Sequence, residues 1–125
     1  MAIIKRIEID GRQVAFNASA AVPRIYRVRF GRDLFEDLSV LMDAIDQSSE
    51  DNSTLSVKAL TTFEDIAYTM AKHADPTIPE TPEEWLDGFN IFSIYGILPQ
   101  IVEMWKLNSA TTSESKKKAA AVIAP

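Results

Sequence analysis

The chain has 125 residues, of which 46% are hydrophobic and 25% charged, and its net charge is −5. This length suits one domain with its own core, whereas two domains would each be too small. Cysteine is absent, which excludes disulfides and thiolate metal sites and fits a reducing cytosol. No apolar run approaches the roughly 18 residues that a membrane span needs, and no signal-peptide pattern is present. We therefore expect a soluble intracellular protein with no membrane partner.

Charge is distributed unevenly along the chain. Residues 1–32 carry seven basic and two acidic residues, whereas residues 33–106 carry three lysines and fifteen carboxylates. Opposite patches on neighbouring copies attract each other and steer docking, so this pattern predicts head-to-tail self-association. An interpretation of equal weight is that both sets of charges are solvated faces with little energetic effect.

The first predicted element is a β-hairpin over residues 3–16. Two short runs with strand-like alternation flank Asp10-Gly11. This dipeptide is a strong hairpin signal, because a type I′ turn needs positive φ at both central residues. A lone two-stranded hairpin is marginal in water, so we expect it to lie against helices or to pair with another chain.

A helix over about residues 20–30 follows, with Ile25, Val28 and Tyr26 as its candidate inward residues. Gly31 comes directly after this helix. Glycine adopts left-handed backbone without a Cβ penalty, so Gly31 is the predicted C-cap.

The next predicted helix covers residues 34–46 and has the clearest apolar periodicity in the chain. Asp33 precedes it as a candidate N-cap, and Glu36 stands in the reciprocal position of a capping box. Residues 47–54 are uniformly polar, which predicts an exposed loop.

A third long helix is predicted over residues 56–74, after which two prolines forbid its continuation. A short helix over residues 82–88 then restarts the chain. Thr81 is its predicted N-cap, a proline occupies the first helical position, and Glu84 is placed to bond back to the cap. Such a cap typically contributes about 1 kcal/mol.

The last predicted helix, residues 90–106, is apolar all round and contains Pro99. Proline predicts a kink here, and an all-round apolar helix must be central or covered by a partner.

Residues 108–125 are small and polar with three adjacent lysines, which predicts a flexible tail. The expected fold is α-dominated α+β, with a hairpin and four to five helices in one domain over residues 1–107.

The chain offers little for catalysis or metal binding. Its single histidine, His73, has no cysteine or second histidine to complete a zinc site, so we expect a surface residue at a helix end. Two carboxylate clusters, within residues 46–51 and 83–87, lie where solubility and helix dipoles explain them. The four glycines are scattered and form no phosphate-binding loop. The sequence predicts a protein that is not an enzyme and needs no metal or cofactor.

Four arginines, Arg24, Arg27, Arg29 and Arg32, suggest a nucleic-acid hypothesis. Arg24 and Arg27 share a helical face, and Tyr26 could stack on a nucleic-acid base. Against this hypothesis, the chain is acidic overall, and the carboxylates of the following helix are ready partners for these arginines. We therefore expect no nucleic-acid partner.

Several stretches together resemble the tail assembly chaperones of long-tailed bacteriophages and prophages, especially those of Gram-positive hosts. The resemblance spans residues 1 to about 108. The stretches that carry it are Tyr-Arg-Val-Arg-Phe-Gly-Arg-Asp at 26–33, Ile-Ala-Tyr-Thr-Met-Ala-Lys at 66–72, Ala-Asp-Pro at 74–76, Pro-Glu-Glu-Trp-Leu at 82–86, Phe89, and the closing run from Ile-Leu-Pro at 97–99 to Trp105.

The resemblance implies a non-enzymatic protein that acts in the host cytoplasm and is absent from the mature virion. Its implied partner is the tape measure protein, which it would bind and keep soluble while tail tube subunits polymerise around it. The family is often accompanied by a longer product of ribosomal frameshifting, which links the chaperone to the tail tube protein. Lys116, Lys117 and Lys118 are candidates for the slippery site, although a solubilising tail is the simpler interpretation of the protein sequence alone.

Two sets of residues are candidates for contact with the client or with other copies of the chain. The apolar set is Phe89, Phe92, Tyr95, Leu98 and Trp105, and the basic set is Arg24, Arg27 and Arg29. An alternative function is that of a small structural tail or connector component retained in the virion. A small regulatory binder is a third class, for which no basic groove or partner-specific helix is identified.

Overall fold

The computed structural model describes residues 3–51 and 57–106, with the backbone alone over residues 46–51. Two strands open the chain and helices follow: β1 (Ile4–Ile9), β2 (Arg12–Asn17), α1 (Ala21–Phe30), α2 (Leu34–Asp51), α3 (Val57–Ala74), α4 (Pro82–Leu86) and α5 (Ile91–Gly96). A further helical segment covers residues 98–106. The predicted α-dominated α+β fold is confirmed. Among the described residues, no helix combines the length and the apolar character that crossing a membrane requires.

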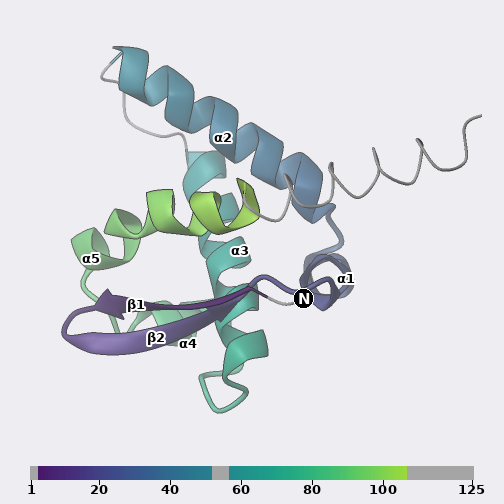
Figure 1. Ribbon diagram of the computed structural model, residues 1–125, viewed down its shortest axis with the longest axis vertical. Helices are drawn as coiled ribbons and strands as arrows, with labels where there is room; N and C mark the ends of the chain where they lie inside the picture. The colour runs from purple at the N-terminus through teal and green to yellow at the C-terminus, as the bar shows by residue number, and fades with distance from the viewer. Residues whose placement is uncertain (1–2, 52–56, 107–125) are drawn as a thin grey trace, which may run out of the picture.

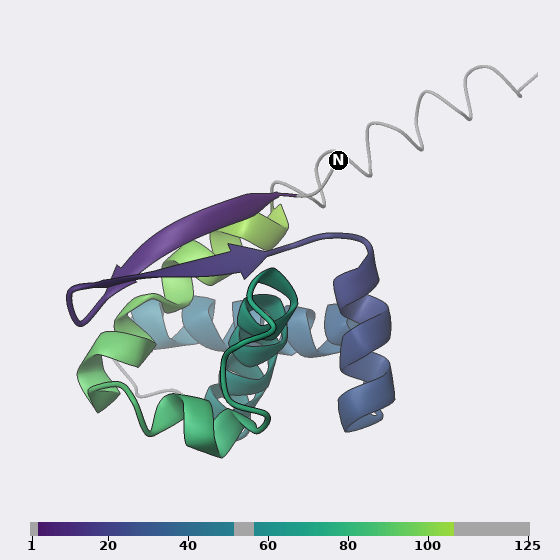
Figure 2. The same ribbon diagram turned by 90° about the horizontal axis from the view of Figure 1, so that it is seen from below.

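Helix α3 is the centre of the fold, and the other elements pack around it (Figures 1 and 2). It contacts β2, α1, α2 and α4. Its fully buried apolar residues include Phe63, Ile66, Ala67, Tyr68 and Met70. The pattern that predicted an amphipathic helix over residues 56–74 therefore marked the core helix, although residue 56 lies outside the described part of the chain.

The hairpin forms as predicted, with strands that pair antiparallel from Ile4 opposite Asn17 to Ile9 opposite Arg12. Asp10 and Gly11 have φ values of 53° and 78°. Positive φ at both central residues is the requirement of a type I′ turn, whose twist matches that of the strands. Ile7, Ile9 and Phe16 point into the core, so the hairpin gains its stability by lying against helices of its own chain.

Helix α1 ends at Gly31, which has a φ of 70° and whose N–H donates to the Arg27 carbonyl. The predicted left-handed cap is confirmed. The prediction that Val28 points inward is wrong, since its side chain is 77% exposed. Tyr26 is buried instead, and a residue two positions further along a helix lies about 200° around the axis. One face therefore cannot bury both residues.

Asp33 caps α2, as expected, by accepting hydrogen bonds from the Phe35 N–H at 2.8 Å and the Glu36 N–H at 3.4 Å. The predicted end of this helix near residue 46 is wrong, because α2 continues to Asp51. Residues 47–51 contain no proline or glycine, so nothing in the local backbone stops the helix where the polar residues begin. The rest of the predicted 47–54 loop lies outside the described residues.

The capped restart at residue 82 is confirmed: the Thr81 hydroxyl accepts from the Glu84 N–H at 3.2 Å, and Pro82 is the first helical residue. Helix α4 ends at Leu86 and is therefore shorter than the predicted 82–88 helix.

The predicted 90–106 helix is divided by a turn at Ile97, two residues before Pro99. Pro99 has no N–H to donate to the Tyr95 carbonyl four residues back, and its ring crowds that carbonyl, which explains the break. The tail predicted over residues 108–125 lies outside the described residues.

Candidate interaction surfaces

Within the described residues, no group of three or more His, Cys, Asp or Glu side chains is arranged to hold a metal ion. His73 lies half-buried in the last turn of α3. The described residues also present exposed apolar and charged side chains.

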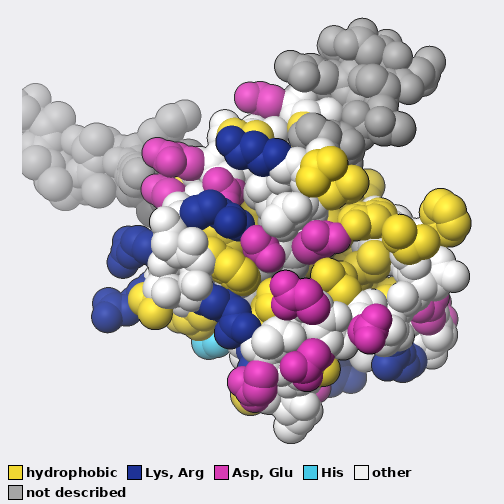
Figure 3. Space-filling view, turned by 180° about the vertical axis from the view of Figure 1, so that it is seen from behind, with side chains coloured by type: hydrophobic (Ala, Val, Ile, Leu, Met, Phe, Trp, Pro, Cys, Tyr) yellow, Lys and Arg dark blue, Asp and Glu magenta, His cyan; other side chains and the backbone are white. Residues whose placement is uncertain are grey.

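The most prominent apolar surface is the first turn of α5, which we call the α5 surface and define as Ile91 and Phe92. Their side chains are 60% and 84% exposed. Figure 3 shows apolar side chains gathered on the side of the molecule where α5 lies. A large aromatic side chain with this exposure contributes little to its own core, and exposed apolar groups that cluster mark interaction sites.

The hairpin turn holds the α5 surface in place. The Asp10 carboxylate accepts a hydrogen bond from the Asn90 N–H at 2.8 Å, and the Asn90 side chain caps α5 by accepting from the Phe92 N–H at 2.9 Å. Hydrogen bonds from Ser93 and Asn90 lower the pKa of Asp10 below its usual 3.8. Contacts from a residue 80 positions away thus fix the turn that presents Phe92.

Arg12 forms a second link between the hairpin and this region. Its guanidinium donates to the Gly88 carbonyl at 2.7 Å and lies 4.7 Å from the centre of the Phe89 ring. Phe89 also makes an edge-on contact with Trp85, with ring centres 5.2 Å apart. The predicted contact residue Phe89 is therefore half-buried and held between an arginine and a core tryptophan.

The other predicted apolar contact residues lie deeper in the chain. Leu98 and Trp105 are 5% and 2% exposed, and both belong to the core of the folded chain. The Trp105 indole N–H donates to the Met70 sulfur at 3.2 Å. Tyr95 is half-buried and donates to Glu64 at 2.6 Å, and this bond raises the pKa of Tyr95 to about 12. Of the five predicted apolar residues, Phe92 is the one whose ring stands largely free on the surface.

The three predicted basic contact residues differ in their surroundings. Arg24 and Arg27 are exposed on the outer face of α1. Arg29 is exposed too, but its guanidinium donates to the Glu80 carbonyl and lies 4.9 Å from the centre of the Tyr68 ring. Arg29 therefore joins α1 to the loop before α4, while Arg24 and Arg27 remain candidates for contact with another chain.

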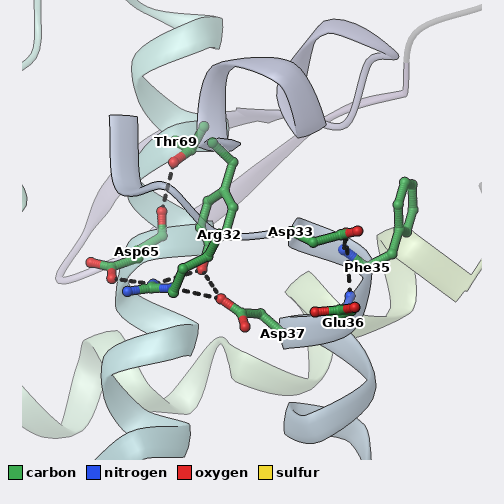
Figure 4. Close-up of polar contacts among 8 residues, drawn as sticks. Arg32, Asp33, Phe35, Glu36, Asp37, Asp65 and Thr69 are labelled. Atoms are coloured by element: carbon green, nitrogen blue, oxygen red, sulfur yellow. Dashed lines mark hydrogen bonds and ion pairs between the residues drawn. The ribbon is translucent and has the colours of Figure 1, made fainter. Parts of the chain in front are cut away.

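Arg32, which was not among the predicted site residues, organises the most connected polar cluster. We call this cluster the Arg32 network and define it as Arg32, Tyr26, Asp37 and Asp65. Arg32 lies 2.8 Å from Asp37 and 2.7 Å from Asp65 and donates to the Tyr26 hydroxyl at 2.7 Å, and Tyr26 donates to Asp37 at 2.5 Å. Figure 4 shows the Arg32 guanidinium between the two carboxylates. The network ties α1, α2 and α3 together.

The electrostatics of the Arg32 network agree with a structural role. Burial raises the pKa of Asp65 above its usual 3.8, and the Arg32 guanidinium opposes that rise. Burial and the bond to Asp37 raise the pKa of Tyr26, so its hydroxyl remains a donor. The bond to Asp65 is the largest cause of a raised pKa at Arg32 itself. Every charged group in the network is paired within it.

Comparison of the chain with models of protein families, with characterised proteins and with solved structures gives no match.

Proposed function

We propose that the chain is a tail assembly chaperone of a long-tailed bacteriophage or prophage, which binds and solubilises the tape measure protein in the host cytoplasm. It performs no chemistry and takes no cofactor. It leaves before the virion is complete, and any link to the tail tube protein runs through a frameshifted longer form. The sequence resemblance suggests this function, and the observation that carries it is the exposed Phe92 on a firmly held helical turn.

The α5 surface suits a client with apolar stripes along a helix. Burying one large apolar side chain contributes about 1.5–3 kcal/mol, which by itself gives weak and reversible binding. Tail tube subunits must displace the chaperone from the client, so each contact has to be weak and reversible. Many copies along one client would add affinity through avidity without making any single contact permanent.

Self-association is the second part of the proposal. Arg24 and Arg27 are exposed on α1, and residues 33–106 carry fifteen carboxylates against three lysines. Attraction between the basic face of one copy and an acidic face of the next would place chaperones side by side along the client. This attraction should weaken with added salt, since exposed charges are screened beyond about 10 Å at 0.1 M ionic strength.

Co-purification with a tagged tape measure fragment tests the function. Phe92→Ser should abolish client retention and leave the circular dichroism spectrum unchanged, because the ring is 84% exposed. Ile4→Ser is the matched control, since Ile4 is 61% exposed on the hairpin and should retain the client. Trp105 is unsuitable for this test because its side chain is core. Full retention by folded Phe92→Ser protein would refute the assignment of the α5 surface, and a wild-type chain that ignores the fragment would refute the function.

Mass spectrometry of purified virions tests the proposed absence from the particle. A chaperone should be missing from them, whereas a structural tail or connector component would be present in stoichiometric amounts.

A further inference from the structure

A groove of about 240 Å³ lies between β2, the end of α3 and α4. Small-molecule pockets usually measure about 300–1,000 Å³, so this groove suits a few side chains of a peptide better than a whole ligand. Its apolar lining comes from residues far apart in the sequence and includes Val14, Ala71, Ile78, Trp85 and Phe89.

One wall of the groove is a strand edge that can accept hydrogen bonds. The Ala18 N–H donates to the Ile3 carbonyl at 2.8 Å, and this bond shows which residues of β2 are hydrogen-bonded to β1. With the observed register, the backbone groups of Gln13 and Ala15 then point away from β1. The sheet of the described residues has two strands only, and both Gln13 and Ala15 line the groove. An open edge beside an apolar groove is the arrangement that binds an extended peptide as an added strand.

Charge favours a basic peptide in this groove. Residues 75–88 contain five carboxylates and no basic residue, and two of the five, Asp75 and Glu84, line the groove itself. Glu80 already pairs with Lys72 at 3.0 Å. Arg12 is the basic residue in the lining, and its guanidinium is occupied by the Gly88 carbonyl and the Phe89 ring. The groove therefore favours an apolar segment with positive charges beside it.

The chain contains such a segment outside the described residues: Lys116, Lys117 and Lys118 are followed directly by Ala-Ala-Ala-Val-Ile-Ala at 119–124. We propose that residues 119–124 bind in the groove as a third strand beside β2, with the three lysines against the carboxylates of residues 75–88. Side chains alternate along a strand, so either register directs one branched residue, Val122 or Ile123, toward the groove. Residues 107–115 can span up to about 30 Å when extended, which is about the diameter of a small domain, so the linker is long enough for the segment to reach the groove of its own chain.

This binding would cover an exposed strand edge, which otherwise invites pairing with other chains. It does not depend on the proposed function, because neither Ile91 nor Phe92 lines the groove.

Amide hydrogen exchange of the full chain, followed by NMR, tests the proposal. The Gln13 and Ala15 amides point outward and should be protected in the wild type. Combined Val122→Asp and Ile123→Asp substitution should raise the exchange rates of these two amides about tenfold or more, because amide exchange reports local opening of the backbone. Val14 and Phe16 amides face β1 and serve as the internal control that the hairpin remains folded.

The matched control substitutes Thr111→Asp and Thr112→Asp, which changes the same number of residues outside the proposed strand and should leave Gln13 and Ala15 protected. Rapid exchange of Gln13 and Ala15 in the wild type, or equal loss of protection in both variants, would overturn the proposal. A concentration series separates the two sources of the segment: protection independent of concentration indicates the same chain, and protection that rises with concentration indicates a neighbouring copy. Concentration-independent and concentration-dependent protection both support the proposal. Neither result tests client binding by Phe92.

Discussion

The junction of α1, α2 and α3 and the junction of the hairpin with α5 use their side chains in opposite ways. At the first, the Arg32 network matches charged groups with one another at distances of 2.5–2.8 Å. At the second, polar groups of the hairpin turn hold a backbone turn whose apolar side chains face outward. Charged side chains at the first junction therefore serve the fold, whereas apolar side chains at the second remain exposed on the surface.

The largest expected effect comes from breaking the Arg32 network. Arg32→Ala should lower the free energy of unfolding by about 2–3 kcal/mol, because Asp37 and Asp65 lose their shared cation. This is less than the ~3–5 kcal/mol of a fully buried pair, since the Arg32 side chain is 40% exposed and partly screened by solvent. Urea denaturation measures the loss. Arg24→Ala, at an exposed arginine, should change stability by less than about 0.5 kcal/mol, and equal losses in the two variants would contradict the structural role of the network.

Removing the cap of α4 should have the next largest effect. Thr81→Ala leaves the Glu84 N–H without its 3.2 Å partner and should cost about 1 kcal/mol in thermal or urea unfolding. Thr81→Ser keeps the hydroxyl and should restore most of the stability. If the serine variant is as unstable as the alanine variant, the methyl group and not the cap is responsible.

A smaller loss of stability but a clear loss of function is expected from Asp10→Gly. Glycine accepts the positive φ of this position, so the variant isolates the loss of the bond to the Asn90 N–H. We expect weaker retention of the tape measure fragment, because the turn that presents Phe92 is no longer held. Asp10→Asn keeps an acceptor oxygen and tolerates left-handed backbone, so it should bind nearly as well as the wild type. Unchanged binding by Asp10→Gly would show that the turn is rigid without this link.

The smallest effect concerns the titration of Asp10. Its folded pKa lies below 3.8 because of the hydrogen bonds from Ser93 and Asn90. The stabilisation from its charged form is therefore complete above the unfolded value and is lost as the pH falls through the folded value. Ser93→Ala should raise the pKa of Asp10 toward 3.8 in an NMR titration of the carboxyl carbon, whereas Ser39→Ala on α2 should not. A pKa that stays low in Ser93→Ala would assign the shift to the Asn90 N–H and the Arg12 charge instead.

The candidate interaction residues were harder to predict than the fold. Trp105 and Phe92 both belong to the same apolar stretch in the sequence, yet one is core and the other is the most exposed large apolar residue recorded for the described chain. A turn at Ile97 separates residues 98–106 from α5, so a single helical pattern cannot assign the faces of both segments. Arg32 was considered for nucleic-acid contact and not as the centre of a network, because its partners lie on three helices and one of them is 33 residues away.

The sequence by itself determined where the hairpin turns, where α1 ends, and where α2 and α4 begin. Asp10-Gly11, Gly31, Asp33, Thr81 and Pro99 act through their own backbone conformation or through neighbours within four residues, so their effects can be read locally. Tertiary structure alone decided which apolar side chains are buried, that Arg32 is shared by three helices, and that the hairpin turn holds α5. These outcomes depend on packing between residues far apart in the chain, and a local pattern contains no information about which partner each face will meet.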